Sequence, residues 1–214
     1  MLAIGINFGF YVYVVGSKLA LVDSIPKYVR IKSTQVSVHK GYKVLDLADL
    51  IRFGKIDIAG FSLILIHGGI NDLDEVIKSG MIAHMFVQDF IRRYVVLRDM
   101  VRRRNRNALV VFSAILPRAG DFKNFFPYVY GVNFALRKWC AKSGGASIFV
   151  PTYEQFLVRG LPRYELFSNS DGLHLNGAGV ERLEAYFQQV MSEDSKLLGQ
   201  CVTSKTTRNY LQAL

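Results

Sequence analysis

Short apolar runs alternate along the chain with stretches in which apolar residues recur every three or four positions. A short apolar run is typical of a buried strand, and the wider spacing is typical of a helix that covers a sheet. The runs predict strands at Phe10–Val15, Ser33–Val38, Leu63–Ile66, Ala108–Leu116 and Ser147–Val150. The wider spacing predicts helices at Val44–Phe53, Ile82–Arg104, Val129–Lys142 and Gly179–Met191, with the Phe-rich stretch Ala119–Pro127 as a loop.

Strands that alternate with helices favour a parallel sheet with helices on both faces, because parallel neighbours need a crossover between them. We therefore predict a three-layer α/β/α fold. Of the 214 residues, 50% are hydrophobic and 21% are charged, a balance that excludes a disordered chain and allows a sizeable core. We assign residues 1–195 to a single domain and residues 196–214 to a polar C-terminal tail.

Neither a membrane span nor a disulfide framework is indicated. No apolar run reaches the roughly 18 residues that a span needs. The apolar N-terminus carries no basic residue before Lys18, so it is interpreted as a core strand rather than a signal peptide. Cys140 and Cys201 lack the spacing of a metal or redox site, and nothing requires an oxidising compartment. An intracellular location is favoured, and no cofactor is predicted.

The stretch Ser62–Leu73, SLILIHGGINDL, has the features of a strand that leads into a site. An apolar run stops in Gly68-Gly69 and is followed by Asn71-Asp72. Ligands of open α/β sheets bind beyond the carboxyl ends of the strands, where such residues would lie. An ordinary strand followed by an Asn-Asp turn is the alternative.

A second candidate lies about a hundred residues downstream, in Ser170–Leu175, SDGLHL. Asp171 and His174 are three residues apart, so the carboxylate can hold one imidazole nitrogen while the other acts as a base. A turn aspartate beside a surface histidine would have the same sequence.

Together these stretches resemble the SGNH (GDSL-type) hydrolase superfamily. Gly69-Ile70-Asn71-Asp72 matches the G-x-N-D block of that family, and Asp171-Gly172-Leu173-His174 matches its D-x-x-H block. Phe112–Arg118, FSAILPR, also looks like the fourth strand of animal members, some of which are encoded in retroelements. The resemblance implies a flavodoxin-like sheet of five strands in the order 2-1-3-4-5. It further implies His174 as base, Asp171 as its partner, and Asn71 with Gly41 as oxyanion donors.

The nucleophile block, G-D-S after the first strand, departs from the family pattern. Aligned on Gly16, Ser17 replaces the usual aspartate and Lys18 replaces the nucleophilic serine. A lysine ammonium cannot form an acyl ester, so this alignment predicts an impaired site in which Lys18 fills the pocket or binds an anion. Ser17 acting from a shifted loop, or Ser24 acting from the following D-S-I-P segment, are the two alternatives.

Two further sets of residues are candidates for binding. Gly69 and His67, at the end of the third predicted strand, could line the crevice. The chain carries 27 basic and 17 acidic residues, a net charge of +10, and seven arginines fall within fifteen residues. A cluster of arginines favours a polyanion such as nucleic acid, although a solvated helix face is the simpler explanation. The cluster ends in Arg102, Arg103, Arg104 and Arg106.

Two functions therefore remain open. One is a hydrolase of small acyl or acetyl esters, impaired by Lys18. The other is a non-catalytic module that binds an anionic or nucleic-acid partner and derives from a retroelement. The sequence names neither the substrate nor the oligomeric state.

Overall fold

Five parallel strands form the central sheet of the computed structural model, which describes residues 6–7, 11–13, 16–26, 28–143, 147–192 and 194–195. Their order across the sheet is β4-β3-β5-β6-β7, so the order implied by the family resemblance is confirmed. The strands are β3 (Ser17–Val22), β4 (Gln35–Val38), β5 (Phe61–His67), β6 (Leu109–Ser113) and β7 (Ser147–Val150).

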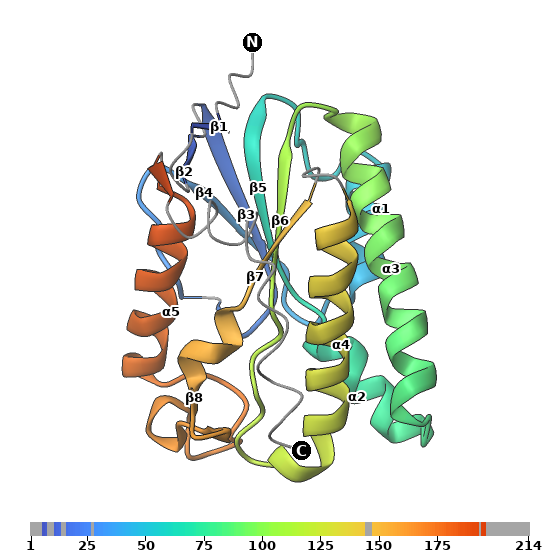
Figure 1. Cartoon of the computed structure of the whole chain (residues 1–214), viewed down its shortest axis with the longest axis vertical. Coiled ribbons are helices and arrows are strands. Elements are labelled where there is room, and N and C mark those ends of the chain that lie inside the picture. The colour runs from blue at the N-terminus through green and yellow to red at the C-terminus, as the bar shows by residue number, and fades with distance from the viewer. Residues whose placement is uncertain are drawn as a thin grey trace.

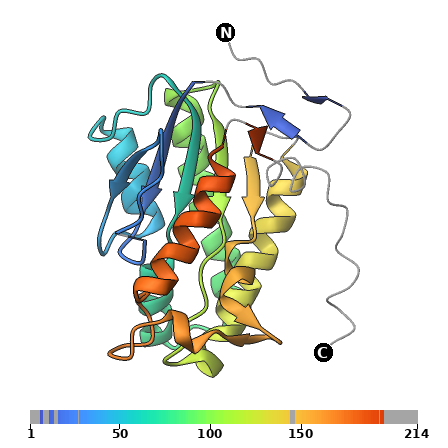
Figure 2. The same cartoon turned by 90° about the vertical axis from the view of Figure 1, so that its left-hand side faces the viewer.

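Helices cover both faces of this sheet, as predicted. Figure 1 shows α1, α3 and α4 on one face of the sheet and α5 on the other. In Figure 2, α5 lies in front of the sheet. The helices are α1 (Val44–Arg52), α2 (Ile70–Ser79), α3 (Ala83–Arg104), α4 (Phe122–Lys142) and α5 (Gly177–Val190). None of the described helices is long and apolar enough to cross a membrane.

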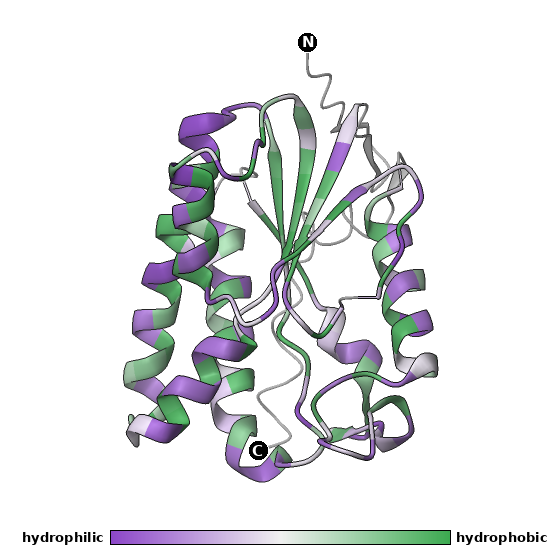
Figure 3. Cartoon of the chain, turned by 180° about the vertical axis from the view of Figure 1, so that it is seen from behind, coloured by the Kyte–Doolittle hydropathy of each residue, from purple (hydrophilic) through white to green (hydrophobic). Residues whose placement is uncertain are grey.

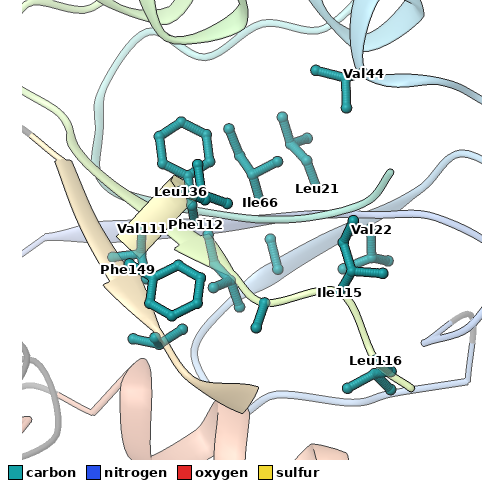
Figure 4. Packing of buried hydrophobic residues seen from close by; sticks show 14 of the residues in the cluster. Leu21, Val22, Val44, Ile66, Val111, Phe112, Ile115, Leu116, Leu136 and Phe149 are labelled. Atoms are coloured by element: carbon teal, nitrogen blue, oxygen red, sulfur yellow. The ribbon is translucent and has the colours of Figure 1, made fainter. Parts of the chain in front are cut away.

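The hydrophobic core lies between the sheet and these helices. Figure 3 shows apolar strands in the middle and helices that alternate between polar and apolar residues. Figure 4 shows the side chains of the central strands packed together, among them Leu21, Ile66 and Phe112, with Leu136 of α4 against them. Each of these side chains is at most 1% exposed, so the sheet is held by continuous apolar burial on both faces.

The shorter elements lie at the two ends of the sheet. The strands β1 (Ile6–Asn7), β2 (Tyr11–Tyr13) and β10 (Asp194–Ser195) form a small antiparallel sheet at the end where the main strands begin (Figure 2). The opposite end carries the hairpin of β8 (Leu157–Val158) and β9 (Leu161–Pro162) (Figure 1). The 3-10 helices η1 (Thr152–Phe156) and η2 (Tyr164–Leu166) flank this hairpin in sequence.

The first strand of the main sheet is not the predicted one. The prediction placed it at Phe10–Val15, but the described part of that stretch, Tyr11–Tyr13, pairs with β1 and β10 instead. The main sheet begins with β3, which pairs with β4 on one side and β5 on the other. Leu19–Val22 is an uninterrupted apolar run, and such a run suits a strand buried on both faces better than an alternating one does.

The structure differs from the predicted elements at two further places. The stretch after Gly69 is the helix α2, which was not predicted, so the alternative of a simple Asn-Asp turn does not apply. Most of the predicted aromatic loop is helical, since α4 begins at Phe122 and contains Pro127 within its second turn. Proline has no backbone N–H, so α4 lacks the hydrogen bond that residue 127 would otherwise donate to the carbonyl of Lys123.

Candidate active site

The ends of the three strands β4, β3 and β5 are joined by backbone hydrogen bonds. The N–H of His39 donates to the carbonyl of Val22 at 2.8 Å, and the N–H of Asp23 donates to the carbonyl of His67 at 3.0 Å. The residues that follow these strands are therefore neighbours at one edge of the sheet. We call it the carboxyl edge, and it is the edge at which open α/β sheets bind ligands.

Strand β3 ends directly in Asp23-Ser24. Asp23 is 2% exposed, and its Oδ1 accepts the N–H of Ile25 at 3.0 Å, which closes the turn that carries Ser24. Ser24 itself is half-buried. Within the described part of the chain, the other carboxylate oxygen of Asp23, Oδ2, has no hydrogen-bond partner.

The charge of His174 reaches this turn. Burial raises the pKa of Asp23 to about 7, while the Ile25 N–H and the charge of His174 act in the opposite direction. A charge influences a carboxyl group this way only across a short distance, because solvent screens longer separations. This influence indicates that His174 and Asp23 lie near one another at the carboxyl edge.

Asp171 and His174 form a hydrogen-bonded pair, as the D-x-x-H pattern predicts. Nδ1 of His174 lies 2.6 Å from Oδ2 of Asp171, and Oδ1 accepts the backbone N–H groups of Leu173 and His174. Partial burial raises the pKa of Asp171, but the bonds from His174 and Leu173 outweigh it and lower the pKa to about 2. The carboxylate is thus ionised at neutral pH and orients the ring, whose Nε2 stays available as a base.

The loop that carries this pair is hydrogen-bonded to the segment between β6 and α4. The carbonyl of Gly172 accepts the N–H groups of Ala119 and Gly120, at 2.8 and 3.1 Å. Gly172 has a φ of 58°, and a Cβ at this position would lie 2.3 Å from the nitrogen of Gly120. Only glycine permits this close approach of the two loops.

Asn71 and Gly41 meet at the same edge. Asn71 lies in the first turn of α2, and its Nδ2 donates to the carbonyl of Tyr42 at 3.0 Å. Gly41 precedes Tyr42 in the loop between β4 and α1, with a φ of 76°. The side-chain amide of Asn71 is therefore beside the backbone that carries the Gly41 N–H.

Ser17 and Lys18 are not at this edge, so the predicted nucleophile block is wrong. They are the first two residues of β3, where Ser17 pairs with Phe61 and Lys18 with Leu63. Val22, at the other end, pairs with His67. Lys18 and Val22 are four positions apart along the strand, a distance of about 13 Å. The Lys18 side chain is 5% exposed and lies at the opposite end of the sheet from His174.

The two predicted ligand-binding residues at the end of β5, His67 and Gly69, are buried in the interior instead. His67 is 2% exposed, its Nδ1 lies 2.8 Å from Oγ of Ser113, and burial lowers its pKa to about 4. Gly69 is buried with a φ of 108°, and a Cβ there would lie 2.5 Å from Cζ of Phe90. Neither residue is presented to the crevice, so the prediction that they bind ligand is corrected.

The arginine cluster lies at the far end of α3. Arg98, Asp99, Arg102, Arg103 and Arg106 line a hollow of about 490 Å³. Arg104 turns away from it, and its guanidinium donates to the carbonyl of Arg52.

Sequence reasoning named Ser24 only as an alternative and assigned no role to Asp72. The signal for Ser24 was present, because Leu19–Val22 followed by Asp-Ser repeats the pattern of an apolar run that stops in polar residues. Asp72 is fully buried, and its oxygens bond the N–H of Val44 and the guanidinium of Arg93. Only the fold reveals these partners, which are 28 and 21 residues away.

Comparison with known proteins identifies the fold. No protein-family model and no curated protein sequence matches the chain. The lipase Lip_vut3 from a goat rumen metagenome superposes with a TM-score of 0.63 and 16% identity, over 81% of this chain and 96% of that one. A GDSL-like lipase from Bacteroides thetaiotaomicron gives 0.63 and 15%, over 82% and 87%. The chain has the SGNH hydrolase fold.

The esterase domain of the ORF1 protein from the zebrafish ZfL2-1 retrotransposon also matches, at 22% identity over 81% of this chain and 97% of that one. Its TM-score is 0.42, so the retroelement origin stays a prediction. In the SGNH fold of this chain, no three His, Cys, Asp or Glu side chains of the described residues gather as metal ligands would. The polar residues at the carboxyl edge suit acid–base and nucleophilic chemistry.

Proposed function

We propose that this chain is a serine ester hydrolase of the SGNH type, with Ser24 as its nucleophile. The observation that carries the proposal is that Asp23-Ser24 follows β3 directly at the carboxyl edge, together with the hydrogen-bonded pair of Asp171 and His174, whose charge acts on Asp23. In the family pattern, Val22-Asp23-Ser24 then takes the place of G-D-S. The impairment expected from Lys18 no longer applies, because Lys18 is at the other end of the strand.

Each residue has a role in acyl transfer that follows from its chemistry. His174 takes the proton of the Ser24 hydroxyl through Nε2 as Oγ attacks the ester carbonyl. Asp171 holds the imidazole in the required tautomer and stabilises the imidazolium. The alcohol leaves with the proton from His174, and a water activated by the same imidazole hydrolyses the acyl-enzyme.

The tetrahedral intermediate needs donors that are already in place when its negative charge develops. The backbone N–H groups of Ser24 and Gly41 and the side-chain amide of Asn71 are the three candidates. One Asn71 N–H is used by Tyr42, which fixes the amide and leaves its second N–H for the substrate.

Hydrolysis of p-nitrophenyl acetate tests this proposal directly. Replacing Ser24 by Ala should lower kcat by about 10⁴-fold, because the nucleophile acts together with its base. Ser17→Ala is the matched control, since it removes a serine hydroxyl from the other end of β3, and activity should stay within about twofold. A fluorophosphonate should label Ser24 and no residue of β3. Activity that survives Ser24→Ala, or a folded protein with no activity, would overturn the proposal.

We propose a second, separate role for the arginine hollow as a binding site for nucleic acid. Arg103 and Arg106 are exposed, and Arg102 is half-buried beside them. Arginine forks bind phosphate oxygens in pairs, and a concave surface lets several act on one backbone. The salt dependence of binding tests this role, because each phosphate that an arginine neutralises releases counterions.

A further inference from the structure

Helix α2 holds three successive residues, 42–44, which are the end of the loop between β4 and α1 (residues 39–43) and the first residue of α1. Asn71 donates to the carbonyl of Tyr42 at 3.0 Å. Glu75 lies one turn further along α2 and forms an ion pair with Nζ of Lys43 at 2.9 Å. These two contacts are on one face of α2, because residues four apart in a helix are neighbours.

The third contact is buried and carries a charge. Oδ2 of Asp72 accepts the N–H of Val44, the first residue of α1, at 3.0 Å. Oδ1 of the same carboxylate accepts Nη1 of Arg93 at 2.8 Å. The Asp72 side chain is 0% exposed and that of Arg93 is 19% exposed. A buried carboxylate is stable in its charged form only with such partners, so Arg93 is needed for Asp72 to hold Val44.

Arg93 is itself fixed in place. It lies on α3, and its guanidinium also pairs with Asp89, one turn earlier in that helix, at 2.7 Å. The planar guanidinium thus bridges helix α3 to helix α2, and Asp72 continues the bridge to the start of α1. Gly41 lies three residues before Val44 and has a φ of 76°. Because glycine has no Cβ, its backbone changes conformation easily unless the flanking residues are held.

We infer that Asp72 and Arg93 are positioning residues, which fix the loop 39–43 so that the Gly41 N–H points at the ester oxygen in the transition state. The inference rests on the proposed function. Neither residue touches the substrate, and both act through the backbone that they hold. An oxyanion donor stabilises charge only at the right position, so displacement of the loop by about 1 Å lowers the rate by about a hundredfold.

The test uses Arg93→Met, which keeps the apolar stem of the side chain and removes the guanidinium. We expect kcat for p-nitrophenyl acetate to fall by about ten- to a hundredfold while KM changes little, because the loop contributes to the transition state. Hydrogen exchange of the Val44 amide should accelerate, and the Gly41 amide resonance should move. Arg93→Lys keeps the positive charge and should recover part of kcat.

Arg137→Met is the matched control. Arg137 lies on α4, its side chain is 31% exposed, and it pairs with Glu154 at 2.8 Å, so this variant removes an ion pair of the same length that involves neither Asp72 nor the loop 39–43. Its loss should leave kcat and the Val44 amide unchanged. If hydrogen exchange of the Val44 amide is unchanged in Arg93→Met, Asp72 and Arg93 do not hold the start of α1. Faster exchange with an unchanged kcat would refute their role in positioning. An inactive unmodified protein would refute the proposed function. Hydrogen exchange of the Val44 amide would still show whether Asp72 and Arg93 hold the start of α1.

Discussion

At the scale of single residues, Asp23 has the least expected environment. It directly precedes the proposed nucleophile, yet it is buried, and Oδ2 has no hydrogen-bond partner in the described part of the chain. Burial disfavours the ionised form, which is why the pKa rises to about 7. Near neutral pH the folded protein therefore carries a carboxyl group that is close to half protonated. This is the opposite of Asp171, whose hydrogen bonds keep it ionised.

We predict that Asp23→Asn stabilises the protein at alkaline pH. The raised pKa means that the folded state binds a proton more tightly than the unfolded state, so stability falls as pH rises from about 4 through about 7. Three pKa units correspond to about 4 kcal/mol. At pH 8 the variant should melt about 8–16 °C higher. The difference should shrink toward pH 4, where Asp23 is protonated in the folded state, and a constant difference across this range would contradict the assigned pKa. Scanning calorimetry at several pH values measures it.

At the scale of elements, the site depends on how loops from different strands contact one another. The loop that carries Asp171 and His174 rests on the loop after β6, through the carbonyl of Gly172. No short-range signal in the sequence specifies this contact, which joins residues more than fifty positions apart.

We predict that Gly172→Ala impairs hydrolysis because its Cβ would meet the backbone nitrogen of Gly120. The loop must move, so Asp171 and His174 lose their alignment, and kcat should fall by about a hundredfold. Gly160→Ala is the matched control. Gly160 also has a positive φ, 79°, but a Cβ there meets nothing within 4 Å. It imposes about 1–2 kcal/mol of backbone strain without a collision, so only stability should change. Equal loss of kcat in both variants would show that strain, not the contact, is responsible.

The sequence predicts most elements of this fold, because apolar periodicity reports burial directly. Four of the five sheet strands and three helices lie within a few residues of their predicted positions, and α4 begins seven residues before its predicted start. The first strand was misplaced because Phe10–Val15, rich in aromatic and β-branched residues, has the higher strand propensity. Burial on both faces, however, favours the plainer run Leu19–Val22. Helix α2 was missed because a strand that ends in glycines also precedes ordinary turns.

The candidate site was predicted only in part, because some of its contacts are local in sequence and others depend on the fold. Asp171 with His174, and Asn71 with the Gly41 loop, are local or motif-based signals, and the structure brings each pair together. The position assigned to the nucleophile depended on which strand comes first, so the misplaced strand led to Ser17 and Lys18, whereas the proposed nucleophile Ser24 follows β3. The partners of Asp72 depend on tertiary contacts and have no sequence signal.

At the scale of the whole molecule, the two proposed activities lie at opposite ends of the sheet. Helix α3 begins near the carboxyl edge and runs back toward the start of β6 (Figure 1). Its 22 residues span about 33 Å, which separates the arginine hollow from Ser24 by most of the length of the molecule. The last turn of a helix also attracts cations, so the cluster can equally be a stabilised helix end.

We predict that these two activities are independent. Replacing Arg102, Arg103 and Arg106 by Gln should weaken binding to single-stranded nucleic acid and reduce the slope of log K against log salt by about 0.7 for each phosphate that is no longer neutralised. It should leave kcat for p-nitrophenyl acetate unchanged, because a Debye length of about 10 Å at 0.1 M salt screens these charges from His174. Ser24→Ala should do the reverse, removing hydrolysis while binding and its salt slope stay the same. If no binding to single-stranded nucleic acid is detected even at low salt, the arginine cluster is a solvated helix end and not a binding site. If the arginine variant also lost hydrolysis while its melting temperature was unchanged, the two ends would be coupled through α3, and separate sites would be the wrong description.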